Sequence, residues 1–158
     1  GKMCIFGDGL PEDHVEAINW FRKAAEQGFA QAQYELGKRY LEGGLGVPAN
    51  PAAAEKWIRK AAEQGDDSAQ HCLAEMYFQG IGLKENHVLA YAWINILAAK
   101  SHQVENRHRE LKRIVPKSWY VHPKLKKEDL EKELSQTEIA QGRSLSTEMI
   151  KKNPNLLN

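Results

Sequence analysis

Apolar and small residues recur along this chain with the 3.6-residue period of an amphipathic helix. Over residues 30–42, Ala32, Leu36 and Tyr40 are spaced by four positions, which places them on one face of a helix. The glycine-rich stretch 43–46 then ends the pattern, because glycine readily adopts the left-handed conformation that closes a helix. The pattern predicts one amphipathic helix over 30–42.

A second helix is predicted to begin at Pro51. Asn50 supplies an N-cap side chain, and proline suits the first helical turn. The helix is expected to end at Gly65, and its apolar stripe consists of Ala54, Trp57, Ile58, Ala61 and Ala62. The two helices together predict an antiparallel pair.

This pair recurs along the chain. Residues 17–28 (AINWFRKAAEQG) match residues 54–65 (AEKWIRKAAEQG), and the pattern of 30–47 returns over 67–83. A period of this length is typical of a solenoid, in which each unit buries its apolar face against its neighbours. The recurrence predicts two further helices, over 68–79 and 87–100.

One tryptophan recurs in each unit, with separations of 37 and 36 residues. Small residues flank each of them, so the indoles are expected to fill the space between closely packed helices. We therefore assign Trp20, Trp57 and Trp93 to the core.

The spaced pattern A-x-x-x-L-G-x-x-Y-x-x-G-x-G-V, followed by A-x-x-W-x-x-K-A-A-x-Q-G, resembles the Sel-1-like repeat family, which is related to tetratricopeptide repeats. The match covers 1–101 and departs from the pattern at positions 74, 83 and 101. Residues 90–102 and 134–149 resemble the last unit and closing helix of bacterial members. The resemblance implies an all-α, right-handed α-solenoid with a C-terminal helical cap. It also implies a scaffold or adaptor that binds another protein.

The resemblance divides the chain into a truncated first repeat, two full repeats and the cap, which cover 1–28, 29–65, 66–101 and 102–158. Because 1–13 align with 37–50, we expect a fragment or processed chain whose first helix is missing. Any export signal would then lie upstream, so the sequence does not distinguish a cytoplasmic location from a periplasmic one. The exposed apolar end of such a fragment favours an end-to-end dimer.

The cap is predicted to contain helices over 103–115 and 135–150. Ser135 and Glu138 have the spacing of a capping box at the start of the second helix. The segment 116–133 begins with proline and is rich in lysine, so we interpret it as a basic insertion that ends in a short helix.

Composition and charge narrow the class of function. Charged residues make up 27% of the chain and hydrophobic ones 42%, as in ordinary soluble domains. No apolar run approaches the ~18–20 residues of a membrane span. Residues 1–100 carry 10 basic and 13 acidic side chains, and residues 101–158 carry 12 and 8. This asymmetry is too mild to indicate nucleic-acid binding, and acidic residues directly follow the basic and aromatic stretch 117–127.

The chain has no motif of catalytic chemistry. It lacks a phosphate-binding Gly-Lys-Ser/Thr loop, a nucleophile elbow and an H-E-x-x-H pair. Two groups have the spacing of metal ligands on a helix, His71 with Glu75, and His102 with Glu105 and His108. Neither group contains the four ligands that a structural zinc site usually has. Cys4 and Cys72 are almost two repeats apart and are expected to be free thiols. We therefore predict no enzyme activity, no cofactor and no metal.

By analogy with tetratricopeptide repeats, the first helix of each unit lines the inner surface of the solenoid. Its residues beside the core stripe are predicted to bind a partner protein or peptide: Tyr34, Lys38, Leu41, His71, Glu75 and Phe78. Equally, Leu41 and Phe78 could pack only against the next repeat. A second hypothesis is recognition of a small ligand or cell-wall fragment, with at most weak hydrolytic activity. Related proteins with that proposed role carry a cysteine pair in each unit, which this chain lacks.

Overall fold

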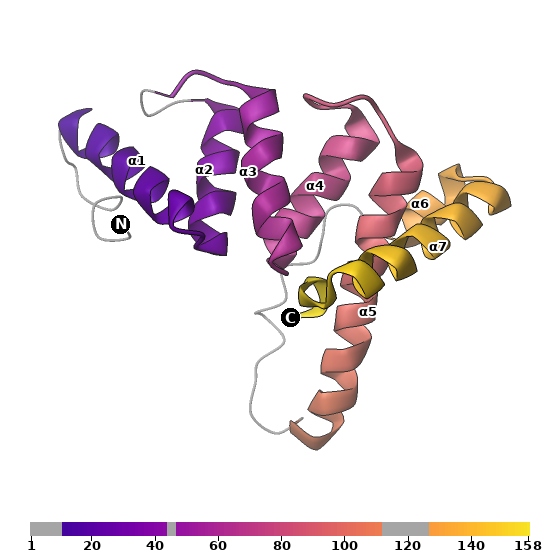
Figure 1. Ribbon diagram of the computed structural model, residues 1–158. Coiled ribbons are helices and arrows are strands. Elements are labelled where there is room, and N and C mark those ends of the chain that lie inside the picture. The colour runs from indigo at the N-terminus through magenta and orange to yellow at the C-terminus, as the bar shows by residue number, and fades with distance from the viewer. Residues whose placement is uncertain (1–10, 44–46, 112–126) are drawn as a thin grey trace.

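The computed structural model describes residues 11–43, 47–111 and 127–158, and the regular elements in these ranges are all helices (Figure 1). They are α1 (Pro11–Glu26), α2 (Ala30–Glu42), α3 (Pro51–Glu63), α4 (Asp67–Gln79), α5 (His87–Leu111), α6 (Lys127–Glu133), α7 (Gln136–Lys152) and the short 3₁₀ helix η2 (Pro154–Leu157).

Helices α1 to α5 stand side by side in a row, and each runs antiparallel to the one before it (Figure 1). Each packs against its neighbours in sequence, so that α2 pairs with α3 and α4 pairs with α5. Helix α7 lies across α5. The all-α, right-handed solenoid with a C-terminal helical cap is therefore confirmed.

The predicted helix starts are confirmed by their caps. The side chain of Asn50 accepts a hydrogen bond from the backbone N–H of Ala53 at 3.0 Å, at the start of α3. At the start of α7, Ser135 and Glu138 form both hydrogen bonds of a capping box. The glycines at 44 and 46 lie outside the described residues.

Small residues allow neighbouring helices to approach closely. Gly37 faces α3 so tightly that a Cβ atom there would lie 2.6 Å from Cγ1 of Ile58. At the other end of the row, a Cβ atom on Gly142 of α7 would lie 2.7 Å from Cδ1 of Tyr91. The core behind these contacts is rich in alanine and includes Ala54, Ala61, Ala62, Ala69 and Ala74, which are all fully buried.

The three tryptophans differ in burial. Trp93 is 2% exposed, as expected of a core residue. Trp57 is half-buried against α2, with the ammonium of Lys60 4.8 Å from its ring centre. Trp20 is 52% exposed, so its assignment to the core is wrong. It lies about 140° around α1 from Ala25, which packs against α2, and so its indole points away from that interface.

The expected break after residue 100 is absent. Helix α5 continues from His87 to Leu111, so the prediction of a separate helix over 103–115 is wrong. The physical reason is local: Ser101 stands where earlier units have Gly28 and Gly65, and serine does not end a helix as glycine does. The short helix of the insertion is present as α6, and residues 112–126 lie outside the described range.

Polar contacts join the cap helices to α5. The hydroxyl of Tyr91 donates to Oε1 of Glu131 on α6 at 2.6 Å, and Arg143 of α7 reaches the same carboxylate at 3.3 Å. Nearby, Nδ2 of Asn95 donates to Oγ of Ser146 at 2.8 Å. Helices α5, α6 and α7 are therefore held in one arrangement by side chains as well as by apolar packing.

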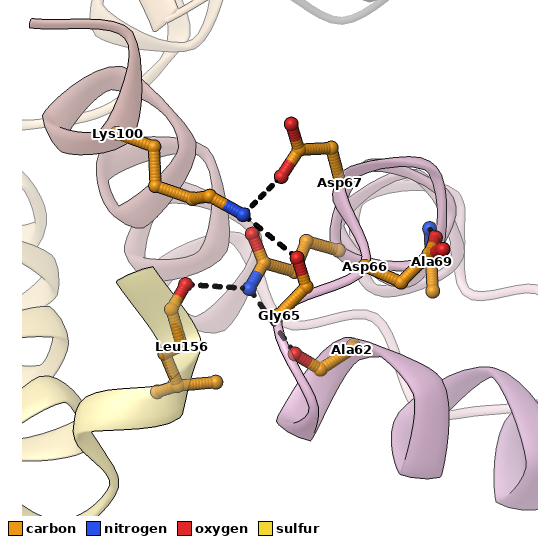
Figure 2. Close-up of polar contacts among 8 residues, drawn as sticks. Ala62, Gly65, Asp66, Asp67, Ala69, Lys100 and Leu156 are labelled. Carbon is orange, nitrogen blue, oxygen red and sulfur yellow. Dashed lines mark hydrogen bonds and ion pairs between the residues drawn. The ribbon is translucent and has the colours of Figure 1, made fainter. Parts of the chain in front are cut away.

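The end of the chain returns to the turn between α3 and α4 (Figure 2). The side-chain nitrogen of Gln70 donates to the carbonyl of Leu156 at 2.9 Å. Beside it, Nζ of Lys100 donates to the carbonyl of Gly65 at 2.7 Å and forms an ion pair with Asp67. In the ranges that the structure describes, no helix is both long and apolar enough to cross a membrane.

The close contact at Gly37 gives a stability prediction. Alanine is about 1 kcal/mol more favourable than glycine inside a helix, but overpacking a core costs about 1–3 kcal/mol. We expect Gly37→Ala to lower the free energy of unfolding by about 1 kcal/mol in urea titrations, because the added methyl group meets Ile58 and the carbonyl of Ala54. The exposed change Ser144→Ala serves as the control. Equal or greater stability of Gly37→Ala would contradict the prediction.

Burial of Leu156 gives a second prediction. This side chain is 2% exposed and belongs to the main core. Large-to-small substitutions in a core cost about 2–5 kcal/mol, so we expect Leu156→Ala to lower the free energy of unfolding by about 2 kcal/mol. The measurement is urea unfolding followed by circular dichroism, with the exposed change Lys152→Ala as the control. If Leu156→Ala behaved like this control, the C-terminal segment would not be docked in solution.

Candidate partner-binding surface

The six predicted contact residues occupy matching positions on two helices. On each helix they are spaced by four and then three residues, and the two sets are 37 residues apart. All six are half-buried. We call this set the helix-A surface: Tyr34, Lys38 and Leu41 on α2, and His71, Glu75 and Phe78 on α4.

Cys72, next to His71 on α4, connects the two halves of this surface. In addition to burial, the charge of Glu75 on α4 raises the pKa of the Cys72 thiol, and the charge of Lys38 on α2 lowers it. Cys72 in turn raises the pKa of Tyr34 on α2. Lys38 and Tyr34 of α2 therefore lie close enough to Cys72 of α4 for their electrostatic influence to be felt between the two helices.

The hydroxyl and the thiol on this surface are both neutral at physiological pH. Burial raises the pKa of Tyr34 to about 12, and the negative charges of nearby groups add to the shift. Burial likewise raises the pKa of Cys72 to about 11, with a further contribution from Glu75 and an opposing one from Lys38. Tyr34 is thus available as a hydrogen-bond donor, whereas Cys72 is a weak nucleophile.

The charged members form ion pairs within their own helices. Nζ of Lys38 lies 3.8 Å from the carboxylate of Glu42. Nδ1 of His71 lies 3.9 Å from the carboxylate of Glu75, and this contact is an ion pair only when the imidazole is protonated. The Lys38 side chain remains 42% exposed. Such pairs are weak at a surface, so these charges can exchange their present contacts for contacts with a partner.

The apolar members are only partly covered. Tyr34, Leu41 and Phe78 pack against the main core on one side, and the Phe78 ring also lies 5.0 Å from the ring of His87. The alternative that Leu41 and Phe78 serve packing is therefore correct in part. Both side chains contribute to the core and keep some accessible surface.

The sequence analysis missed two neighbours of this surface. Glu42 follows Lys38 by four residues, a spacing that signals an ion pair on a helix. His87 comes from the start of α5, and no local pattern places it beside Phe78.

Among the described residues, no group of three or more His, Cys, Asp or Glu side chains could hold a metal ion. The side chains of His102, Glu105 and His108 lie outside the described part of the chain. Most of the basic and aromatic stretch 117–127 also lies outside it. Its last residue, Lys127, donates to Oδ1 of Asn95 at 2.8 Å.

Comparison with solved structures identifies a similar fold. The chain is similar to c5321, a protective antigen present in uropathogenic Escherichia coli strains that displays an SLR fold, with 32% identity and a TM-score of 0.72. That similarity covers 95% of this chain and 28% of c5321. The chain is also similar to a Sel1 repeat protein from Oxalobacter formigenes, with 41% identity, a TM-score of 0.49, and coverage of 52% of this chain and 33% of that one. This chain therefore spans no more than a third of either protein's length. No curated protein sequence matches it.

The repeats also match a family model. The model of the Sel1 repeat matches residues 1–29, 30–66 and 67–102, which together cover more than half of the chain. These matches and the helical solenoid lead to the same conclusion: the chain belongs to the Sel1 repeat family.

Proposed function

We propose that this chain is a scaffold that binds a segment of a partner protein along the helix-A surface. Sel1 repeats typically form protein-interaction scaffolds, and their fold is generally not catalytic. The observation that carries the proposal is a repetition one unit apart: on both α2 and α4, a partly exposed charged residue is followed three positions later by a partly buried apolar side chain, Lys38 with Leu41 and Glu75 with Phe78.

The chemistry of the helix-A surface suits a peptide with both apolar and charged side chains. Leu41, Phe78 and the ring of Tyr34 offer apolar area, and aromatic residues are enriched in protein interfaces. Lys38 and Glu75 offer opposite charges one repeat apart, so a partner with an acidic and a basic residue at that separation would bind in one orientation.

The surface is also held in place before any partner binds. Each of its members is half-buried on a helix that packs against neighbours on both sides. A rigid surface loses little conformational entropy on binding, which favours affinity for a given contact area. The small-ligand alternative remains a prediction without an observation that favours it.

A pair of variants tests the proposal. We expect Tyr34→Ala with Phe78→Ala to weaken binding of a partner at least tenfold, because both anchors of the surface are removed. Proteins retained from the source cell by the immobilised chain would be purified and titrated against each variant. The control is Trp20→Ala with Lys56→Ala, which removes an aromatic ring and a charge from exposed positions on α1 and α3. Circular dichroism verifies that each variant remains folded. Equal binding by both double variants would place the partner elsewhere.

Cys72 provides an independent probe of the same surface. With a pKa of about 11, its thiol is almost entirely protonated at pH 8. An ordinary cysteine, with a pKa near ~8.5, is by contrast about one-quarter ionised. In a Cys4→Ser background, we expect iodoacetamide to alkylate Cys72 at least tenfold more slowly than glutathione at pH 8, since the smaller ionised fraction outweighs the greater nucleophilicity of a thiolate with a higher pKa. The rate should rise about tenfold per pH unit up to about pH 10 and level off above pH 11, and bound partner should slow it further. Mass spectrometry measures the rate, and a partner that binds without protecting Cys72 would contradict the proposed surface.

A further inference from the structure

The α1–α2 turn and the α3–α4 turn have the same backbone structure. Gly28 and Gly65 have φ angles of +96° and +90°. In each turn, the side-chain nitrogen of the following glutamine, Gln33 or Gln70, donates to the carbonyl eight residues earlier, at 3.0 and 3.1 Å. The residue after each glycine donates its backbone N–H five residues back, at 3.2 Å in both turns. Two equivalent surfaces are therefore present, one repeat apart.

The α3–α4 turn binds a segment of the chain itself, residues 153–158. Nδ2 of Asn153 donates to the carbonyl of Glu63 at 2.8 Å. Gln70 donates to the carbonyl of Leu156, the contact that ends at Leu156 in Figure 2. The Leu156 side chain is fully buried. The carbonyl of Asn155 lies so close to Gly65 that a Cβ atom there would collide with it. Residues 153–158 of the same chain are therefore held at this turn by identified hydrogen bonds and by burial of Leu156.

The α1–α2 turn is open among the residues that the structure describes. Apart from the two chain neighbours of Gly28, no atom of these residues lies within 4 Å of the position of a Cβ atom on it. In the described part of the chain, the side-chain nitrogen of Gln33 has one acceptor, whereas that of Gln70 has two. Helices α5 and α7 also pack against η2 at the α3–α4 turn. The α1–α2 turn therefore repeats the part of that site formed by the glycine, the glutamine and the last helix carbonyls, without the segment.

The N-cap residue of α2, Phe29, gives a second and independent reason to expect binding at the α1–α2 turn. At the α3–α4 turn the N-cap of α4 is Asp66, whose side chain accepts from the N–H of Ala69 at 2.8 Å. At the α1–α2 turn the N-cap of α2 is Phe29, which makes no side-chain cap hydrogen bond and is 63% exposed. Phenylalanine at this place loses a helix cap and exposes an aromatic ring. A binding partner that covers the ring would explain why an exposed phenylalanine stands here in place of a capping residue.

We propose that the α1–α2 turn docks a segment of a partner protein that has the chemistry of residues 153–158. In the partner, an asparagine would reach the carbonyl of Glu26, a proline would follow, and a leucine in one helical turn would insert beside Phe29. The carbonyl of that leucine would accept the second hydrogen of Gln33. This surface is separate from the helix-A surface and does not depend on the function proposed there.

The occupant is a partner protein and not a second copy of this chain. The chain's own segment is docked on its own α3–α4 turn, where tethering gives it a high effective concentration. A second copy therefore has no unoccupied segment to donate at ordinary concentrations.

The probe is an acetylated and amidated peptide with the sequence of residues 151–158, KKNPNLLN, titrated into the full ¹⁵N-labelled chain. We expect saturable chemical-shift changes at the backbone amides of Gly28 and Phe29 and at the side-chain amide of Gln33. The same peptide with aspartate in place of the leucine equivalent to Leu156 should cause none of these changes, because a carboxylate cannot replace the apolar contact of leucine with the exposed ring of Phe29.

A variant separates binding from folding. Phe29→Asp gives α2 the N-cap residue that α4 has, so we expect unchanged or higher thermal stability together with at least tenfold weaker peptide binding. The matched control, Gln31→Asp, adds the same charge two residues later at an exposed position and should bind like the parent chain.

Four outcomes would overturn the proposal. Shift changes at Gly65 instead of Gly28 would mean that the peptide exchanges with the chain's own segment. Equal binding by the parent and Phe29→Asp, or equal binding of both peptides, would mean that the contacts proposed here do not form. Concentration-dependent shifts at Gly28 without peptide would identify a second copy as the occupant.

Discussion

The close approach of neighbouring helices is the constraint on which this fold depends. A methyl group at Gly37 or at Gly142 would lie less than 3 Å from the side chain opposite, and the alanines between these two contacts are fully buried. Larger side chains there would hold the helix axes apart. The tightly packed interior of a protein does not tolerate such gaps. Because the axes lie close, residues such as Leu36, Ile58 and Leu73 are removed completely from water.

Buried polar groups then fix how one unit follows the next. The carbonyls of Ala25 and Ala62 lie near the ends of α1 and α3 and each accept the backbone N–H of the turn glycine. Gln33 and Gln70 donate a second hydrogen bond to the same carbonyls and so tie the start of the next helix to each turn. Gln64 donates to Oε1 of Gln33 at 2.7 Å and so links α2 to the end of α3. At the matching position of the last unit stands Lys100, whose buried ammonium needs both the Gly65 carbonyl and Asp67. Where the C-terminal segment meets the repeats, a charged lysine therefore takes the place that a neutral glutamine has in the preceding unit.

The same packing shapes both proposed binding surfaces. On the helix-A surface, burial of the Tyr34 and Cys72 side chains on α2 and α4 raises their pKa values, so that both groups are neutral beside the partly exposed charges of Lys38 and Glu75. At the α1–α2 turn, the shared backbone geometry leaves Gly28 open, and Phe29 provides an exposed ring. Both surfaces lie on rigid repeats, and neither requires a change in the solenoid to become accessible.

The sequence by itself determined the helices, their caps and their order. Helical periodicity and the caps at Asn50 and Ser135 are local properties, and a repeated sequence must fold into repeated units. The period also places the six residues of the helix-A surface at matching positions of two units, whereas their role in binding was inferred by analogy with tetratricopeptide repeats and stays a prediction. Only the tertiary structure decided which faces are covered. It exposed Trp20 and placed Leu156 on the α3–α4 turn. Burial and docking depend on which distant segment lies against a surface, and periodicity along the chain carries no information about that.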